Sequence, residues 1–78
     1  MYWKVKSVSP LDNYMLLLTF EDGEQRHFDV KPYLDFGVFR ALKSNRRFNT
    51  VKVYADTIAW DGEIDLDPEF LYAHSTKI

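Results

Sequence analysis

Residues 14–30 constrain the fold more than any other stretch, because they predict two apolar strands joined by a tight turn at an Asp-Gly pair. A loop of residues 21–23, built as a type I turn followed by a left-handed glycine, sets Phe20 opposite Glu24. A shorter loop would set Phe20 opposite Gln25 and would mix apolar and polar residues on one face. We therefore predict the longer, bulged turn.

This pairing separates the side chains of the hairpin into two faces, because successive residues of a strand point to opposite sides. The face expected to be buried carries Tyr14, Leu16, Leu18, Phe20, Phe28 and Val30. The other face carries Met15, Leu17, Thr19, Gln25, His27 and Asp29. Its apolar members make this second face a place to look for a partner.

Length and composition indicate a single globular domain over residues 1–78. Hydrophobic residues make up 46% of the chain and aromatic residues 17%, which is ample for a core. We expect order from about residue 2 to 72, a frayed tail over 73–78, and folding either alone or as a dimer.

Several classes of protein are excluded by what the chain contains. It has no cysteine, which removes disulfide scaffolds, thiolate metal sites and cysteine nucleophiles. Its longest uncharged apolar run, residues 14–18, is far too short for a membrane span, and Lys4 and Lys6 interrupt the apolar start. We expect a soluble, cytoplasmic protein without a membrane partner.

The hairpin is expected to be preceded by one strand. Residues 2–8 alternate Trp3 and Val5 with lysines, which predicts a strand with one buried face. Turn formers at residues 9–10 and 12–13 make the connection short, so the first strand should lie antiparallel to the hairpin. A meander of three strands results.

Short helical segments are expected next. Asp29 can cap a helical turn at residues 31–34, and Gly37 then breaks the chain. Residues 38–44 predict a short helix that packs with an apolar stripe of Val38, Phe39 and Leu42.

Residues 48–54 and 57–60 predict two more strands, and a second Asp-Gly pair follows them. One register of this hairpin pairs Ile58 with Ile64; a register one residue longer pairs Trp60 with Ile64, and the pattern does not choose between them. Residues 67–69 then form an N-cap and the first turn of a helical segment ending near residue 72.

The fold class is therefore α+β. We predict an antiparallel or mixed sheet of about five to six short strands in two meanders, with short helices between them and a helical turn at the end.

The charges are segregated, although the net charge is only −2. Residues 40–52 carry only positive charges, at Arg40, Lys43, Arg46, Arg47 and Lys52. Residues 56–69 carry only negative charges, at Asp56, Asp61, Glu63, Asp65, Asp67 and Glu69. The basic stretch makes a regulatory or nucleic-acid-associated domain the alternative function, although dedicated nucleic-acid binders are usually far more basic.

No pattern indicates an enzyme. His27 has no framed nucleophile in the sequence, the isolated glycines do not form a phosphate-binding loop, and the acidic run at 61–69 does not match the calcium loop of an EF-hand. We expect no catalytic residues, cofactor, metal or small-molecule substrate. A solvated strand edge explains the acidic run better than cation binding does.

Aromatic residues are more numerous than a core of this size can hide, and exposed aromatic residues are common anchors of protein interfaces. We therefore expect a protein partner or a homodimer. The interaction surface that we predict comprises Met15, Leu17, His27, Tyr54 and Trp60.

A series of spaced motifs runs along the chain: Asp12-Asn13-Tyr14, Leu16-Leu17-Leu18-Thr19-Phe20, Asp22-Gly23, Phe28-Asp29-Val30-Lys31-Pro32-Tyr33-Leu34, Gly37-Val38-Phe39, Leu42-Lys43, Phe48, Val51-Lys52-Val53, Ile58, Trp60, Asp65-Leu66-Asp67-Pro68-Glu69 and Leu71-Tyr72. In this order they resemble the bacterial and phage family called domain of unknown function 2442. The resemblance extends from about residue 3 to 72. One departure is the shorter loop after Trp60, where the family often has Trp-Pro-Asn-Gly.

The resemblance implies a small α+β domain without accepted catalytic residues. Many members of the family are free-standing genes beside a gene for another small protein, an arrangement like that of toxin and antitoxin pairs. Some carry an appended helix-turn-helix domain, which we do not expect in a chain that ends at Ile78. The function that we expect is that of a protein interaction module, and the gene arrangement of the family gives its finer form, an antitoxin-like partner of a neighbouring small protein.

Overall fold

In the computed structural model, which describes residues 3–78, the Asp-Gly hairpin forms between β2 (Met15–Phe20) and β3 (Gln25–Asp29). The Phe20 amide donates to the Glu24 carbonyl at 2.9 Å, and the Gly23 amide donates to the Phe20 carbonyl at 2.8 Å. Gly23 has a φ of 90°, which a glycine adopts without steric cost. The bulged turn is confirmed.

A strand precedes the hairpin, but its bounds differ from the prediction. β1 (Val5–Leu11) pairs antiparallel with β2, and the turn is η1 (Asp12–Tyr14). The expected turn at residues 9–10 is wrong, because both residues belong to β1. The sheet accepts Pro10 since β1 is an edge strand, where a missing N–H need not break a ladder. Tyr2, where we expected the strand to begin, lies outside the described residues.

Three short helical segments follow β3: η2 (Lys31–Tyr33), η3 (Gly37–Lys43) and α1 (Asn45–Phe48). The predicted stripe of Val38, Phe39 and Leu42 is wrong for Val38, whose side chain is 62% exposed. The reason is that η3 is a 3-10 helix, in which residues three apart share a face. Leu42 is buried and Phe39 packs on the core, whereas a residue four positions before Leu42 turns away.

The strand expected from residue 48 begins later. Phe48 ends α1, and β4 comprises only Lys52–Tyr54. Ser44 caps α1 by accepting the Arg47 amide at 3.4 Å, so a local helical turn replaces the weak strand pattern.

The second Asp-Gly pair joins β5 (Thr57–Trp60) to β6 (Ile64–Leu66) in the longer of the two registers considered. Trp60 pairs with Ile64, and Ile58 pairs with Leu66. This register keeps all four apolar side chains of the two pairs on the inner side of the sheet. The Trp60 indole N–H donates to the Phe48 carbonyl at 3.0 Å. The longer register is favoured because it buries the indole while its N–H remains hydrogen-bonded.

The end of the chain is held by pairing, so the expectation of a frayed tail over 73–78 is wrong. α2 spans Pro68–His74, and β7 (Thr76–Lys77) pairs antiparallel with β3. Ser75 between them is buried and receives two hydrogen bonds from Arg26, at 2.6 Å to its Oγ and 2.8 Å to its carbonyl. The expected cap is confirmed, because the Asp67 carboxylate accepts the Glu69 amide at 2.8 Å.

A polar and aromatic cluster fixes α2 to the hairpin. The Tyr72 ring stacks on Trp3 with centroids 3.6 Å apart, and the Arg26 guanidinium carbon lies 4.3 Å from the centroid of the Tyr72 ring. Glu24 accepts hydrogen bonds from Arg26 at 2.7 Å and from the Tyr72 hydroxyl at 3.0 Å. The bond from Arg26, followed by that from Tyr72, holds the pKa of Glu24 below its ordinary value, while partial burial opposes the shift.

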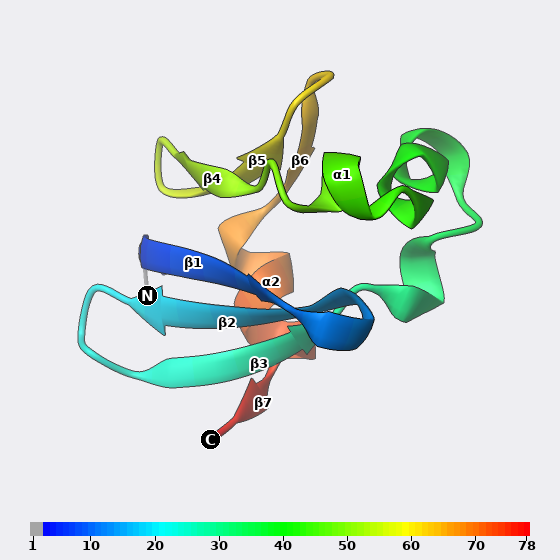
Figure 1. Cartoon of the computed structure of the whole chain (residues 1–78). Helices are drawn as coiled ribbons and strands as arrows, with labels where there is room; N and C mark the ends of the chain where they lie inside the picture. The colour runs from blue at the N-terminus through cyan, green and yellow to red at the C-terminus, as the bar shows by residue number, and fades with distance from the viewer. Residues whose placement is uncertain (1–2) are drawn as a thin grey trace.

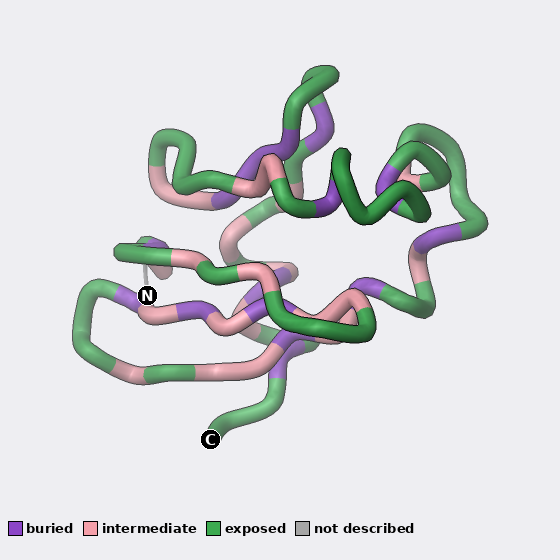
Figure 2. The backbone as a smooth tube through the Cα atoms, in the orientation of Figure 1, coloured by how far each residue is buried: buried purple, intermediate pink, exposed green. Residues whose placement is uncertain are grey.

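Residues 3–78 form seven strands in two antiparallel sheets, which we call the large sheet (order β1-β2-β3-β7) and the small sheet (order β4-β5-β6). The two predicted meanders thus lie in separate sheets, and the α+β class is confirmed. Figure 1 shows α2 behind the large sheet and the small sheet above the β1 edge. The core between them is made of Val5, Leu16, Leu18, Phe20, Phe28, Val30, Leu34, Leu42, Phe48, Ile58, Trp60, Ile64 and Leu71. In Figure 2 the exposed backbone gathers at the turns and along the segment of η3.

None of the helices formed by residues 3–78 combines the length and the apolar composition needed to cross a bilayer.

Candidate functional site

The fold distributes the predicted interaction residues over three places. Met15, Leu17 and His27 lie together on one face of the large sheet, Tyr54 lies on β4 of the small sheet, and Trp60 lies in the core. Trp60 is only 2% exposed, so its assignment to an exposed surface is wrong. The Trp60 side chain faces the core because of the register of β5 and β6, which the sequence pattern left open.

The outer face of the large sheet, meaning the side away from the core, is the first candidate surface. Strand pairing sets Leu11 beside Met15 and Leu17 beside His27, with Ser9 on the far side of Leu17. The outer face consists of Ser7, Ser9, Leu11, Met15, Leu17, Thr19, Gln25, His27, Asp29 and Thr76. Leu11 was absent from our prediction because we expected the first strand to end before it.

No described element covers this outer face. α2 packs on the opposite side, where its Phe70 meets Phe28 and its Tyr72 meets Phe20. Neither Met15 nor Leu17 belongs to the core cluster of residues 3–78 or to the side chains packed against it. The large sheet therefore presents a stripe of partly exposed apolar side chains, in which Leu11 is 39% exposed and Met15 and Leu17 are half-buried.

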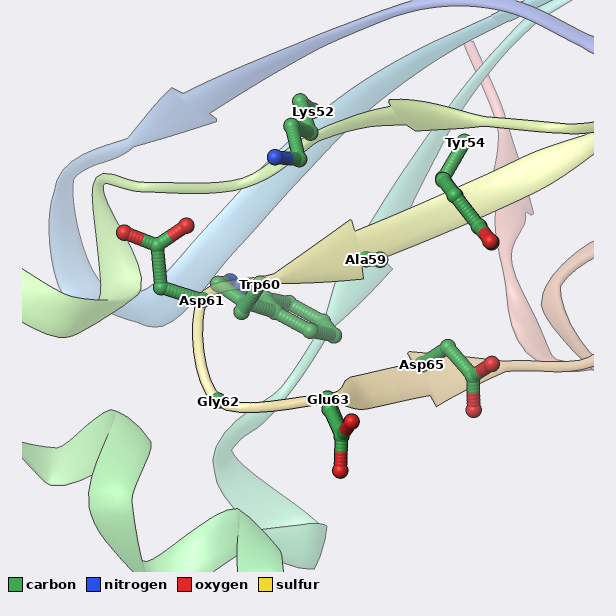
Figure 3. A pocket seen from close by; sticks show the side chains of 8 residues that line it. All are labelled: Lys52, Tyr54, Ala59, Trp60, Asp61, Gly62, Glu63 and Asp65. Atoms are coloured by element: carbon green, nitrogen blue, oxygen red, sulfur yellow. The ribbon is translucent and has the colours of Figure 1, made fainter.

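The second candidate surface is a groove of about 420 Å³ on the outer side of the small sheet (Figure 3). We call it the acidic groove; it is lined by Lys52, Tyr54, Ala59, Trp60, Asp61, Gly62, Glu63 and Asp65. Lys52, Ala59 and Asp65 form one cross-strand row, because Ala59 pairs with both of the others. The short side chain of Ala59 leaves the floor of the groove open between taller neighbours.

Charge in the acidic groove is unevenly distributed. Figure 3 shows Asp61 at the turn and Glu63 and Asp65 along the β6 side, opposite Lys52 and Tyr54 on β4. Within the described part of the chain these three carboxylates accept no hydrogen bond and form no ion pair. Tyr54 is 60% exposed, so its ring is available for contact.

The predicted basic residues do not form one continuous patch. Arg40 donates to the Asp35 carbonyl at 3.2 Å, and Lys43 pairs with the Asp35 carboxylate at 2.6 Å. The hydrogen bond from Lys43 lowers the pKa of Asp35. Arg46 and Arg47 lie on α1 and form no bond to Asp35, and Lys52 lines the acidic groove.

A second hollow, of about 600 Å³, adjoins the acidic groove. We call it the arginine hollow; its lining comprises Ala41, Ser44, Arg46, Arg47, Thr50, Asp61 and Gly62. The two hollows share the turn residues Asp61 and Gly62. Arg47 bridges them by donating from Nη1 to the Asp61 carbonyl at 3.3 Å.

The acidic run and His27 gather no further chemistry. Over residues 3–78 no three acidic or histidine side chains are grouped as ligands for a metal ion. His27 is half-buried beside Leu17 and Thr76 on the large sheet. From the sequence we identified the acidic residues but missed their placement beside Tyr54. The alternation along residues 52–54 was the available signal, because it puts Lys52 and Tyr54 on the same face of a strand.

Comparison with known proteins gives one finding. The family described as "Protein of unknown function (DUF2442)" matches residues 5–77, nearly the whole chain. Searches of curated proteins and of solved structures gave no match.

Proposed function

This chain belongs to the DUF2442 family, and from that premise we propose that it is a small interaction module that binds another protein through the outer face of its large sheet. The proposed role is binding and not catalysis. Its finer form, taken from the gene arrangement of the family that the sequence resembles, is that of an antitoxin-like partner of the small protein encoded beside it.

The observation that supports the proposal is the uncovered apolar stripe of Leu11, Met15 and Leu17. These side chains adjoin each other across and along strands β1 and β2, so they form one patch and not scattered positions. Each square ångström of apolar surface that a partner removes from water contributes about 25 cal/mol. Large uncovered apolar patches on small proteins commonly mark interfaces.

The surroundings of the stripe also suit a protein partner. Its neighbours Ser7, Ser9, Thr19 and Gln25 are uncharged hydrogen-bonding residues. Interfaces commonly combine an apolar centre with a polar rim and few charges at the centre. One ion pair lies at the end of the stripe, where Lys31 Nζ is 3.0 Å from the Asp29 carboxylate and 3.8 Å from Met15 Sδ. The acidic groove and the arginine hollow lie elsewhere, on the small sheet and around α1.

A co-expression experiment tests the proposal. The chain is produced together with the product of the adjacent gene, and the mixture is analysed by size-exclusion chromatography with light scattering. We expect one complex with the unaltered chain. Replacing Leu17 with Glu should separate the two proteins, because a carboxylate would be desolvated at the centre of the interface.

The matched control is Val38→Glu, which introduces the same charge at another exposed apolar position, on η3. This variant should retain the complex. Circular dichroism confirms that both variants are folded. Independent elution of the unaltered proteins at micromolar concentration, or equal loss of the complex in both variants, contradicts the proposed role.

A further inference from the structure

Two surfaces of opposite charge adjoin at the turn between β5 and β6. The acidic groove lies on one side of Asp61 and Gly62, and the arginine hollow lies on the other. Within one molecule, the described arginines of the hollow form no ion pair with the carboxylates of the groove.

The carboxylates of the acidic groove are not paired with a cation of the same molecule over residues 3–78. Asp61, Glu63 and Asp65 form no ion pair within the described chain, and Lys52 is the one cation among the described residues that line the groove. An exposed Tyr54 ring completes the groove, and the face of a tyrosine ring attracts a guanidinium. The groove is therefore suited to an arginine side chain.

The arginines of α1 have unused donors. Arg46 is exposed and makes no hydrogen bond or ion pair within residues 3–78. Arg47 is also exposed, and its guanidinium reaches only the backbone carbonyl of Asp61, at 3.3 Å. Each guanidinium thus retains donors that could engage carboxylates in pairs.

We propose that two copies of this chain form a dimer about a two-fold axis near the Asp61–Gly62 turn, with the α1 arginines of each copy bound to the acidic groove of the other. Because the two charged surfaces adjoin at the turn, a two-fold rotation about an axis at their boundary places each surface opposite its complement. The same pair of contacts then occurs twice, as a closed symmetric dimer requires. This dimer leaves the outer face of the large sheet available to a different partner.

The contacts determine how the dimer should respond to salt. A guanidinium over the Tyr54 ring would lie beside the carboxylates of Glu63 and Asp65, above the open floor at Ala59. Exposed ion pairs are individually weak and are screened by salt, so the dimer depends on several of them acting together. We expect its dissociation constant to rise by about tenfold or more between about 0.05 M and 0.5 M salt.

Charge reversal tests the pairing directly by sedimentation equilibrium at low salt. One variant carries Glu63→Lys with Asp65→Lys, and another carries Arg46→Glu with Arg47→Glu. Each should be monomeric alone, because like charges then face each other in both contacts. An equimolar mixture should dimerise again, since both contacts of the mixed dimer have complementary charges.

Controls separate this pairing from effects of net charge and folding. Glu21→Lys with Glu69→Lys changes the net charge equally at exposed positions outside the groove, and Lys6→Glu matches a single arginine reversal. Both controls should still dimerise. Arg46→Glu alone leaves the Arg47 contact with the turn intact, so it tests the contact even if the double reversal disturbs folding.

Three results would overturn the dimer: an unaltered chain that stays monomeric at low salt and near-millimolar concentration, a dimer that persists in both charge-reversed variants, or a mixture that fails to reassociate. Leu17→Glu should leave the dimer unchanged. Failure of the co-expression experiment with a salt-sensitive dimer intact would therefore reject only the proposed partner surface.

Discussion

Leu18 shows how strongly one residue of the hairpin contributes to the fold. Its side chain is completely buried on the inner face of β2, surrounded by the core cluster. Leu18→Ala should lower the free energy of unfolding by about 2 to 5 kcal/mol, because the lost methyl groups leave a cavity. Urea unfolding measures the change. Leu17→Ala, one residue away on the outer face, should cost less than about 1 kcal/mol, and equal losses would contradict the assignment of faces.

Gly23 tests the turn chemistry on which the hairpin prediction was based. Its φ is +90°, and a Cβ at this position would meet no other atom within 4 Å. Gly23→Ala should therefore destabilise the protein by backbone strain alone, by about 1 to 2 kcal/mol. Gly23→Asn should cost less, because asparagine tolerates positive φ better than alanine does. Thermal unfolding of the two variants checks this order, and a neutral Gly23→Ala would refute it.

At the scale of elements, α2 and β7 owe their positions to contacts far away in sequence. Arg26 on β3 reaches Ser75 and Glu24 while its guanidinium lies against Tyr72. A short C-terminal helix has little stability of its own, so these contacts and the burial of Leu71 hold it against the hairpin. Local sequence contains no signal for a strand of residues 76–77, which forms because β3 offers a free edge.

The Glu24 bonds predict how stability depends on acidity. Because they hold the pKa of Glu24 below its ordinary value of 4.5, the unfolded chain binds more protons at this residue under acidic conditions. The stabilisation is complete above that ordinary pKa and is lost as the pH falls through the lowered pKa. Glu24→Gln should therefore be less stable at neutral pH and should lose less stability on acidification.

Thermal unfolding midpoints of the unaltered chain and Glu24→Gln, recorded from about pH 2 to pH 7, measure this difference. Glu21→Gln in the same turn is the matched control and should follow the unaltered chain, because the Glu21 side chain forms no hydrogen bond or ion pair within residues 3–78. Parallel curves for Glu24→Gln and the unaltered chain would contradict the role of the Glu24 bonds.

At the scale of the whole molecule, the two sheets share one core but present different surfaces. The large sheet offers an apolar stripe with a single ion pair, Asp29 with Lys31, at its end. The small sheet and α1 offer adjoining charges of opposite sign. A module with these two surfaces could pair with itself through one and with another protein through the other. The two experiments proposed above examine these surfaces separately.

Local pattern by itself determined the α+β class, the bulged hairpin and the faces of β2 and β3, because turn chemistry and a period of two act between neighbouring residues. It also located the acidic and basic residues that form the candidate surfaces. Tertiary structure alone decided the register of Trp60, the 3-10 winding that exposes Val38, and the pairing of β7 with β3. Each of these depends on burial or on a free strand edge that distant residues supply, and no local pattern records such contacts.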